Sequence, residues 1–395
     1  MIKLNSVFEK LMKKLKLLFF SGKRGGINHF IPIINELKRF KHFNIHLLMS
    51  DMHLSEQFGS THKNYSYLKT KIYKTKSLKK NYKASKIERA YSLSNGMKKN
   101  IDILKKIKPD LLIILGDRSE LYSIAVPALI LNIPIAHFYG GDLTQGCTDE
   151  PTRHSLSMIS NYHFVSNKKS ENNLIKFKID KKNIFNVGLS SLHAMDNIKI
   201  KNKIDIFNKF NLDHSKRLFI IIQHPETWEL ENTKKQIKTT IQALKNYKEN
   251  KLFIYPCSDP GSKIIIDELK KIKNKPYNKI FKDIKFTDFY SLFKHADIII
   301  GNSSAGILES FFFKTPALNI GKRQKNRFQT SNILNSDYKV NNITKNINKL
   351  LNKKFNFTPN KSFYYKSNGI SKVVKIFKNL NYQKKNNFKQ FLKLN

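Results

Sequence analysis

The stretch HFYGGDLTQGCTDEPTRHS at residues 137–155 concentrates side chains that can transfer protons or bind anions. It supplies three acids, Asp142, Asp149 and Glu150. Two acids in one cleft can have their pKa values driven apart, so that one donates a proton and the other accepts one. Arg153 can bind a phosphate or hold a carboxylate ionised. His137 can contact a ligand, or lie in the core with its ring nitrogens satisfied. The glycines between these residues allow the loop to curve closely around a substrate.

Two shorter motifs follow apolar runs nearer the N-terminus. GDRSE at residues 116–120 places Asp117 and Arg118 directly after the run LLIIL, where a strand would open into a cleft. Asp117 is a candidate for this cleft, although an Asp before a helix can equally serve as a solvated cap. The turn SGKRGGINH at residues 21–29 supplies Arg24 and glycines that let the backbone approach a ligand. It lacks the GxxxxGK[ST] pattern of a Walker loop, so these glycines serve either a ligand or the turn itself.

Two motifs in the second half of the chain have the same placement. In IIIQHPETWE, His224 follows an apolar run and is kept off a helix by Pro225, so its imidazole can move a proton or bond to a phosphate. In IIIGNSSAGILES, the hydroxyls of Ser303 and Ser304 stand at the start of a helix, where they form either an anion cradle or an ordinary N-cap. Glu309 can reach a ribose from this helix or lie on its solvated face.

The elements that must position these residues alternate between short apolar runs and amphipathic segments, which is typical of βαβ units. Strands are predicted at residues 16–20, 45–49, 111–115, 133–136, 218–222, 252–255, 297–300 and 317–320. Helices are predicted at residues 27–40, 97–107, 120–131, 152–160, 231–248, 262–273, 287–295, 304–313 and 369–380. Residues 62–90 are rich in Lys and Tyr and are expected to form a long excursion with room for one helix.

This pattern predicts an α/β protein with two doubly wound, Rossmann-like domains facing a central cleft. In such sheets ligands bind beyond the carboxyl ends of the strands. The expected division is an N-terminal extension over 1–15, a first domain over 16–190, a second, nucleotide-binding domain over 191–366, and a segment over 367–395 whose helix packs back on the first domain. The length of 395 residues is sufficient for two separate cores.

The formal net charge of +44 comes mainly from lysine. Such an excess of positive charge can bind nucleic-acid phosphates, a membrane surface or an anionic substrate. Asn and Ile are abundant as well, which is what an AT-rich genome encodes, and the sequence has no Arg-rich block, RNP-like motif or zinc finger. We therefore expect solvated lysines over the whole surface and no specific nucleic-acid partner.

The two cysteines, Cys147 and Cys257, are too few for a disulfide framework or a four-cysteine zinc site, and a reducing cytoplasm is the simplest setting. No metal-ligand spacing is visible. No run of about 18 apolar residues exists, so no membrane span is expected. Residues 1–20 allow a short amphipathic helix that would pack on the domain or lie on a membrane.

Together, GDRSE, HxxGGD, DEPTRHS, HPET and GNSSAGILES, in this order, resemble the hydrolysing UDP-N-acetylglucosamine 2-epimerases. These include the bacterial sialic acid pathway enzymes and relatives that act on a UDP-diacetamido-trideoxyhexose. The resemblance extends over residues 16–380 and is specific as a set of motifs. It implies the GT-B architecture, with the UDP-sugar bound between two Rossmann-like domains, no cofactor, and a homo-oligomer, either a dimer or a tetramer.

The resemblance also implies roles for individual residues. The catalytic acids would be Asp117, Asp142 and Glu150, with His224 near the diphosphate to assist the departure of UDP. The residues that contact the substrate or UDP would be Arg24, Arg118, His137, Arg153, Ser303, Ser304, Glu309 and Arg323. A carboxylate would remove the proton at C2 while UDP leaves C1, and water would add to the resulting 2-acetamidoglycal to give N-acetylmannosamine.

Three departures from the family pattern leave the substrate open. Gly26 stands where an acid is usual, Asp142 replaces a glutamate, and Tyr139 replaces a His or Glu. Within the same class, the alternatives are the same reaction on UDP-2,4-diacetamido-2,4,6-trideoxyhexose and a non-hydrolysing epimerisation. Outside it, they are a GT-B glycosyltransferase and a non-catalytic nucleotide-sugar or RNA binder.

Overall fold

The computed structural model describes residues 14–144, 147–352, 355–358, 363–380 and 382. Most of the predicted N-terminal extension, including the amphipathic helix considered there, and the tail after residue 382 lie outside the described residues.

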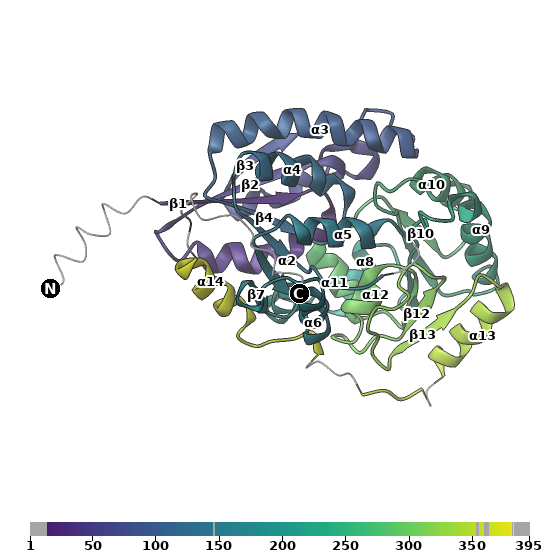
Figure 1. Ribbon diagram of the computed structural model, residues 1–395. Helices are drawn as coiled ribbons and strands as arrows, with labels where there is room; N and C mark the ends of the chain where they lie inside the picture. Colours follow the sequence, from purple (N-terminus) through teal and green to yellow (C-terminus); the bar gives the residue numbers. More distant parts are fainter. Residues whose placement is uncertain (1–13, 145–146, 353–354, 359–362, 381, 383–395) are drawn as a thin grey trace.

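The described chain forms two lobes, each built on a parallel sheet (Figure 1). The first sheet has seven strands in the order β3-β2-β1-β4-β5-β6-β7. Its strands are β1 (Leu15–Ser21), β2 (Phe43–Ser50), β3 (Lys71–Thr75), β4 (Leu111–Leu115), β5 (Ile135–Phe138), β6 (Tyr162–Val165) and β7 (Ile184–Asn186). The helices of this part of the chain are α2 (Arg24–Leu37), α3 (Lys86–Ile107), α4 (Tyr122–Ile130), α5 (Asp149–Met158), α6 (Lys168–Lys176) and α7 (Ser190–Asn197).

The second sheet has six strands in the order β10-β9-β8-β11-β12-β13. Its strands are β8 (Leu218–Ile222), β9 (Asn250–Ile254), β10 (Asn278–Phe281), β11 (Ile298–Gly301), β12 (Ala317–Ile320) and β13 (Ile333–Ser336). The helices that follow α7 are α8 (Lys203–Lys209), α9 (Thr233–Ala243), α10 (Ser262–Lys271), α11 (Phe286–Lys294), α12 (Ser304–Leu308), α13 (Val340–Leu351) and α14 (Gly369–Asn379).

Alternating side chains of the central strands enter different cores. In β1, Leu17 and Phe19 belong to the core that contains α2, whereas Leu18 and Phe20 belong to the core that contains residues of α3 and α4. Because successive strand residues point to opposite faces, this division places helices on both faces of the sheet. The second sheet is covered in the same way, with separate cores on its two faces. The predicted fold class of two doubly wound α/β lobes is therefore confirmed.

The strand order fixes where ligands can bind. β1 pairs with β2 on one side and with β4 on the other, and β8 is flanked in the same way by β9 and β11. The connections that leave neighbouring strands therefore diverge at β1/β4 and at β8/β11, which opens a crevice at the carboxyl ends of those strands. The turns that follow β1, β4, β8 and β11 all carry motifs that the sequence analysis selected.

The structure contains strands that the sequence analysis did not predict, namely β3, β6, β7, β10 and β13. Most of them are short, and the edge strands β3, β10 and β13 are only partly buried, so their sequences lack continuous apolar runs. Residues 62–90 accordingly hold a strand as well as the first turn of α3. That helix begins 11 residues before the predicted residue 97, where the Ser85 hydroxyl accepts a hydrogen bond from the Glu88 amide at 3.1 Å.

The last described helix, α14, returns to the first lobe and packs against α2 (Figure 1). Val373, Val374 and Phe377 enter the same core as β1, and the Phe377 ring meets that of Phe164 edge-on at 5.4 Å between centroids. The chain thus crosses to the second lobe and comes back, which ties the two lobes together.

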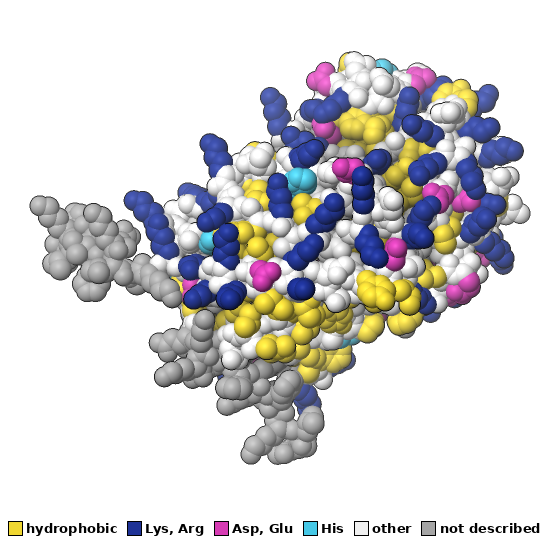
Figure 2. Space-filling model, turned by 90° about the horizontal axis from the view of Figure 1, so that it is seen from above, with side chains coloured by type: hydrophobic (Ala, Val, Ile, Leu, Met, Phe, Trp, Pro, Cys, Tyr) yellow, Lys and Arg dark blue, Asp and Glu magenta, His cyan; other side chains and the backbone are white. Residues whose placement is uncertain are grey.

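On the face drawn in Figure 2, Lys and Arg side chains are spread over most of the view and are not gathered in one patch. Acidic and apolar side chains lie among them, and apolar side chains predominate along the lower edge. Among the described residues, no helix is both long enough and apolar enough to cross a membrane.

Candidate active site

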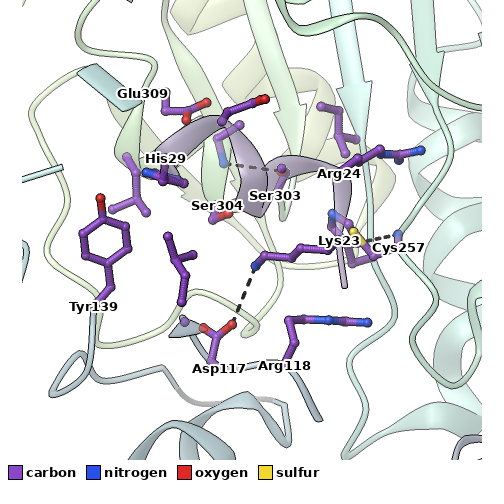
Figure 3. Close-up of a pocket in the computed structure, with 18 of the residues that line it drawn as sticks. Lys23, Arg24, His29, Asp117, Arg118, Tyr139, Cys257, Ser303, Ser304 and Glu309 are labelled. Atoms are coloured by element: carbon purple, nitrogen blue, oxygen red, sulfur yellow. Dashed lines mark hydrogen bonds and ion pairs between the residues drawn. The ribbon is translucent and has the colours of Figure 1, made fainter. Parts of the chain in front are cut away.

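A cavity lies between the lobes, at the carboxyl ends of the central strands (Figure 3). The charged residues that the first lobe contributes to its lining are Lys23, Arg24, Asp117, Arg118, Asp142, Asp149 and Arg153. The polar residues that the second lobe contributes include His224, Cys257, Asp283, Tyr290, Ser303, Ser304, Glu309, Arg323 and Arg327. Ten of the twelve side chains that the sequence analysis selected therefore line one cavity.

Asp117, directly after β4, is surrounded by cations. It accepts a hydrogen bond from the Arg153 guanidinium, and its carboxylate lies 3.8 Å from the Lys23 ammonium and 4.0 Å from the Arg327 guanidinium. Burial acts to raise the pKa of this carboxyl, but the three cations outweigh burial and hold the pKa well below its usual range. Asp117 is therefore ionised at neutral pH.

The other two acids that the first lobe contributes to the cavity are neutralised by arginines of the opposite lobe. Arg327 donates from Nε to Oδ2 of Asp142 at 2.8 Å, and Arg323 donates from Nη2 to Oδ2 of Asp149 at 3.0 Å. All four side chains are at least 85% buried, which leaves little water to screen these pairs. These ion pairs bring the acidic wall of the first lobe against the basic loop that follows β12.

His224, at the end of β8, is held in one orientation. Its backbone amide donates to Asn302 Oδ1 at 2.7 Å, and Asn302 Nδ2 donates back to the His224 carbonyl at 2.9 Å. The Cys257 amide donates to Nδ1 of the ring at 3.3 Å. Burial, together with nearby Arg323, holds the imidazole pKa well below 6.5, so the ring is neutral and carries its proton on Nε2. A neutral imidazole with a free Nε2–H can donate to an anion.

The start of α12 and Glu309 also line the cavity. Ser303 caps the short helix α12 by accepting a hydrogen bond from the Ala305 amide at 3.3 Å, and Ser304 begins that helix. Glu309 follows the helix, is partly buried, and accepts a hydrogen bond from the Tyr290 hydroxyl at 3.3 Å. Burial raises the pKa of this carboxyl to about 7, although the Tyr290 hydroxyl opposes the shift. Glu309 faces the cavity and does not lie on a solvated helix face.

Two of the selected residues are not brought into the cavity lining. His137 is completely buried in β5, with Nδ1 bonded to the Ser157 hydroxyl at 3.1 Å and Nε2 bonded to the Gly116 carbonyl at 2.7 Å. Both ring nitrogens are satisfied, so His137 is a core residue that holds the Gly116 turn and does not contact a ligand from this position.

Glu150 also points away from the cavity. Its carboxylate accepts the Thr144 amide at 2.6 Å and lies 3.7 Å from Nε2 of His154. Its neighbour Asp149 faces the cavity instead. The two residues begin α5, where successive side chains are rotated by about 100° around the helix, so only one of them can face the cleft.

Two selected arginines line the cavity with their charges already engaged across the lobes. The Arg24 guanidinium donates to the Lys282 and Tyr255 carbonyls, and its Nε lies 3.7 Å from Asp283. Arg118 forms an ion pair with Asp259, a residue of the second lobe. Both side chains therefore hold the lobes together in the absence of ligand.

Lys23, Asp149, Tyr290 and Arg327 are among the polar residues of the cavity that were given no role from the sequence. Lys23 and Asp149 immediately precede selected residues, and Arg327 lies four residues after Arg323. For Lys23 and Asp149 the available signal was their place within a selected motif, and for Arg327 it was the nearness of Arg323. Tyr290 lies within an apolar helix, and no sequence pattern distinguishes it from the core.

No group of three or more His, Cys, Asp or Glu side chains within the described ranges is arranged to hold a metal ion. Both cysteines line the cavity as free thiols, and burial raises the pKa of Cys147 to about 12. A thiol with so high a pKa is a poor nucleophile at neutral pH.

This chain is similar to known proteins of one family in sequence and in fold. A family model described as UDP-N-acetylglucosamine 2-epimerase matches residues 35–378. The GDP/UDP-N,N'-diacetylbacillosamine 2-epimerase (hydrolyzing) of Campylobacter jejuni is 33% identical over 347 residues, which cover 87% of this chain and 89% of that protein. The UDP-N,N'-diacetylbacillosamine 2-epimerase (hydrolyzing) of Legionella pneumophila is 27% identical over 347 residues, 86% of this chain and 89% of that protein.

The same architecture occurs in a crystal structure of the Methanocaldococcus jannaschii UDP-GlcNAc 2-epimerase in complex with UDP-GlcNAc and UDP. The TM-score is 0.74 with 21% sequence identity, and the match covers 93% of this chain and 99% of that chain. The two proteins therefore share a fold.

The buried carboxyl of Glu309 predicts a pH-dependent stability. Between pH 4.5 and about 7 the native state retains a proton that the unfolded state has lost, so the free energy of unfolding falls as the pH rises. A shift of this size is worth about 3 kcal/mol. Glu309→Gln should abolish this loss, so that its stability relative to wild type increases between pH 4.5 and 8 in urea unfolding. Glu229→Gln, at a half-exposed acid, should retain the wild-type pH slope. An unchanged slope in Glu309→Gln would show that Glu309 titrates normally.

Proposed function

Because this chain belongs to the UDP-N-acetylglucosamine 2-epimerase family, we propose that it hydrolyses a UDP-2-acetamido sugar with inversion at C2 and release of UDP. The chain is an enzyme of the hydrolysing 2-epimerase class. The observation that carries the proposal is the wall of buried carboxylates in the first lobe, which faces arginines and a neutral histidine of the second lobe across one cavity.

We assign the proton transfers to Asp117, Asp142 and Asp149. One of these carboxylates takes the proton from C2, and the electrons of that C–H bond form a C1=C2 double bond as the C1–O bond breaks. UDP departs with the electron pair of the broken bond, its charge met by Arg323 and by the Nε2–H of His224. Water then adds to the glycal, its oxygen at C1 and a proton at C2 on the opposite face.

Two substrates fit this chemistry. UDP-N-acetylglucosamine would give N-acetylmannosamine, the first sugar of a sialic acid pathway. UDP-2,4-diacetamido-2,4,6-trideoxyhexose would react in the same way, since only C1 and C2 take part. The relatives from C. jejuni and L. pneumophila favour the second substrate, because both are named for N,N'-diacetylbacillosamine.

We place the reaction in the cytoplasm, where the two free thiols at the cavity would stay reduced. The spread of Lys and Arg side chains over the face drawn in Figure 2 supports a solvating role for the charge and not a specific nucleic-acid partner.

Product analysis tests the reaction. Purified protein incubated in D₂O with each UDP-sugar, and with the GDP form of the second, is expected to release free nucleoside diphosphate and a sugar that carries deuterium at C2 in proton NMR. Epimerisation with the nucleotide retained would indicate the non-hydrolysing reaction. Transfer to an added acceptor without C2 exchange would indicate a glycosyltransferase. Absence of turnover together with salt-dependent RNA binding would indicate a binding protein.

The start of α5 offers a matched pair of variants. Asp149→Asn should lower kcat by about 10²–10⁴-fold, because it removes a carboxylate from the cavity. Glu150→Gln should lower kcat by less than about tenfold, because its carboxylate only supports the Thr144 amide. Steady-state release of UDP measures both. A larger loss of kcat in Glu150→Gln than in Asp149→Asn would assign the catalytic role to Glu150.

We further propose that the enzyme is a homo-oligomer that associates through α3 and α4. These helices pack on each other, and large apolar side chains of both are exposed, among them Tyr91 at 60% and Ile130 at 74%. Light scattering after size exclusion should give at least twice the chain mass of 46.2 kDa, and Ile130→Lys should reduce the mass toward that of the monomer. A monomeric wild type at micromolar concentration would contradict the proposal.

A further inference from the structure

Lys23 differs from the other cations of the cavity in how little it is engaged. The arginines that line the cavity each hold a carboxylate or backbone carbonyls, and their side chains are 1–13% exposed. The side chain of Lys23 is 25% exposed. Among the described residues its ammonium has one ion pair, the 3.8 Å contact with Asp117, and no hydrogen bond. Lys23 is therefore the cation that a ligand can recruit at least cost.

The position of Lys23 suits a ligand between the lobes. It precedes α2, and its side chain extends through the middle of the labelled residues toward Asp117 (Figure 3). Its charge acts on Asp117 in the first lobe and on His224 and Glu309 in the second. The ammonium thus stands between the acidic wall and the side of the cavity assigned to the nucleotide.

The chain makes room for this side chain at Gly26. A Cβ at Gly26 would lie 3.3 Å from Cγ and 3.6 Å from Cε of Lys23. The aliphatic stem therefore runs over a residue that has no side chain, and the stem is packed while the ammonium remains free to turn.

We propose that Lys23 binds the diphosphate of the nucleotide sugar and turns away from Asp117 as it does so. The inference rests on the proposed function, because it requires a ligand with a diphosphate. A lysine is a compact charge on a flexible stem, and a diphosphate presents more charge and more acceptor oxygens than a carboxylate that already has other cations. Asp117 keeps Arg153 and Arg327 as partners when Lys23 leaves.

This exchange links substrate binding to the strength of the base. Asp117 faces Lys23 before α2, Arg153 on α5 and Arg327 after β12, and Cys147 and Arg323 also lie within its electrostatic reach. Loss of one of three cations raises the basicity of the carboxylate at the moment when the C2 proton must be removed. While Lys23 faces Asp117, it acts together with Arg153 and Arg327 to lower the pKa of that carboxyl.

The test compares Lys23→Met and Lys23→Arg with Lys325→Met. Methionine retains the stem over Gly26 without the charge, and Lys325 is an exposed lysine in the loop between Arg323 and Arg327. Calorimetric titration with UDP should show that Lys23→Met weakens binding about ten- to hundredfold and flattens its salt dependence. Lys23→Arg should restore most of the affinity, and Lys325→Met should bind UDP like wild type.

Kinetics provide a second readout. Lys23→Met should raise KM for the UDP-sugar, and the acidic limb of kcat/KM against pH should move to higher pH, because Asp117 has lost a cation that lowers its pKa. UDP affinity and KM equal to those of Lys325→Met would overturn the inference. A loss of kcat with unchanged UDP affinity would overturn it as well. If wild type releases no UDP from any sugar, the proposed function fails, while UDP titration still tests Lys23.

Discussion

The structure depends on the neutralisation of buried acids in one lobe by arginines of the other. Asp142 and Asp149 lie in a cavity with little water, where an unpaired carboxylate would cost several kcal/mol. Arg327 and Arg323 supply the missing charge only if the second lobe lies against the first. The cavity is therefore formed by the closure of the lobes, and its chemistry does not exist in either lobe alone.

A second set of buried charges behind the cavity holds this arrangement. Arg89 joins Asp51 to Glu120 within the first lobe, and the Ser258 hydroxyl of the second lobe donates to Asp51 at 2.7 Å. Arg118 extends the set to Asp259 across the interface. Such networks contribute little net stability compared with apolar packing. Separation of the partners would leave a buried charge unpaired, so the networks fix a single relative position of the lobes. A defined position is what proton transfer at a sugar carbon requires.

The same arrangement explains how a nucleotide sugar can be both bound and activated. The cations that meet the diphosphate in our scheme, Lys23 and Arg323, already hold carboxylates, so a phosphate competes with an existing partner. Binding then redistributes charge within the cavity. When Lys23 turns to the diphosphate, Asp117 keeps Arg153 and Arg327, so its charge is not left unpaired in a buried site.

The sequence by itself determined the two sheets and the turns that face each other. Runs such as LLIIL and LFIII coincide with β4 and β8, because strands buried on both faces must be continuously apolar. Partly buried strands such as β3 and β10 were missed, because they lack that pattern. The order of the polar motifs identified the family, and ten of the selected side chains line the cavity. Only the tertiary structure decided that Asp149 and not Glu150 faces the cleft, that His137 is satisfied in the core, and that Lys23 is the least engaged cation. Those outcomes depend on the rotation of a helix and on contacts between residues of different elements, such as Lys23 with Asp117 and His137 with Gly116, and a local pattern of residue types does not encode either.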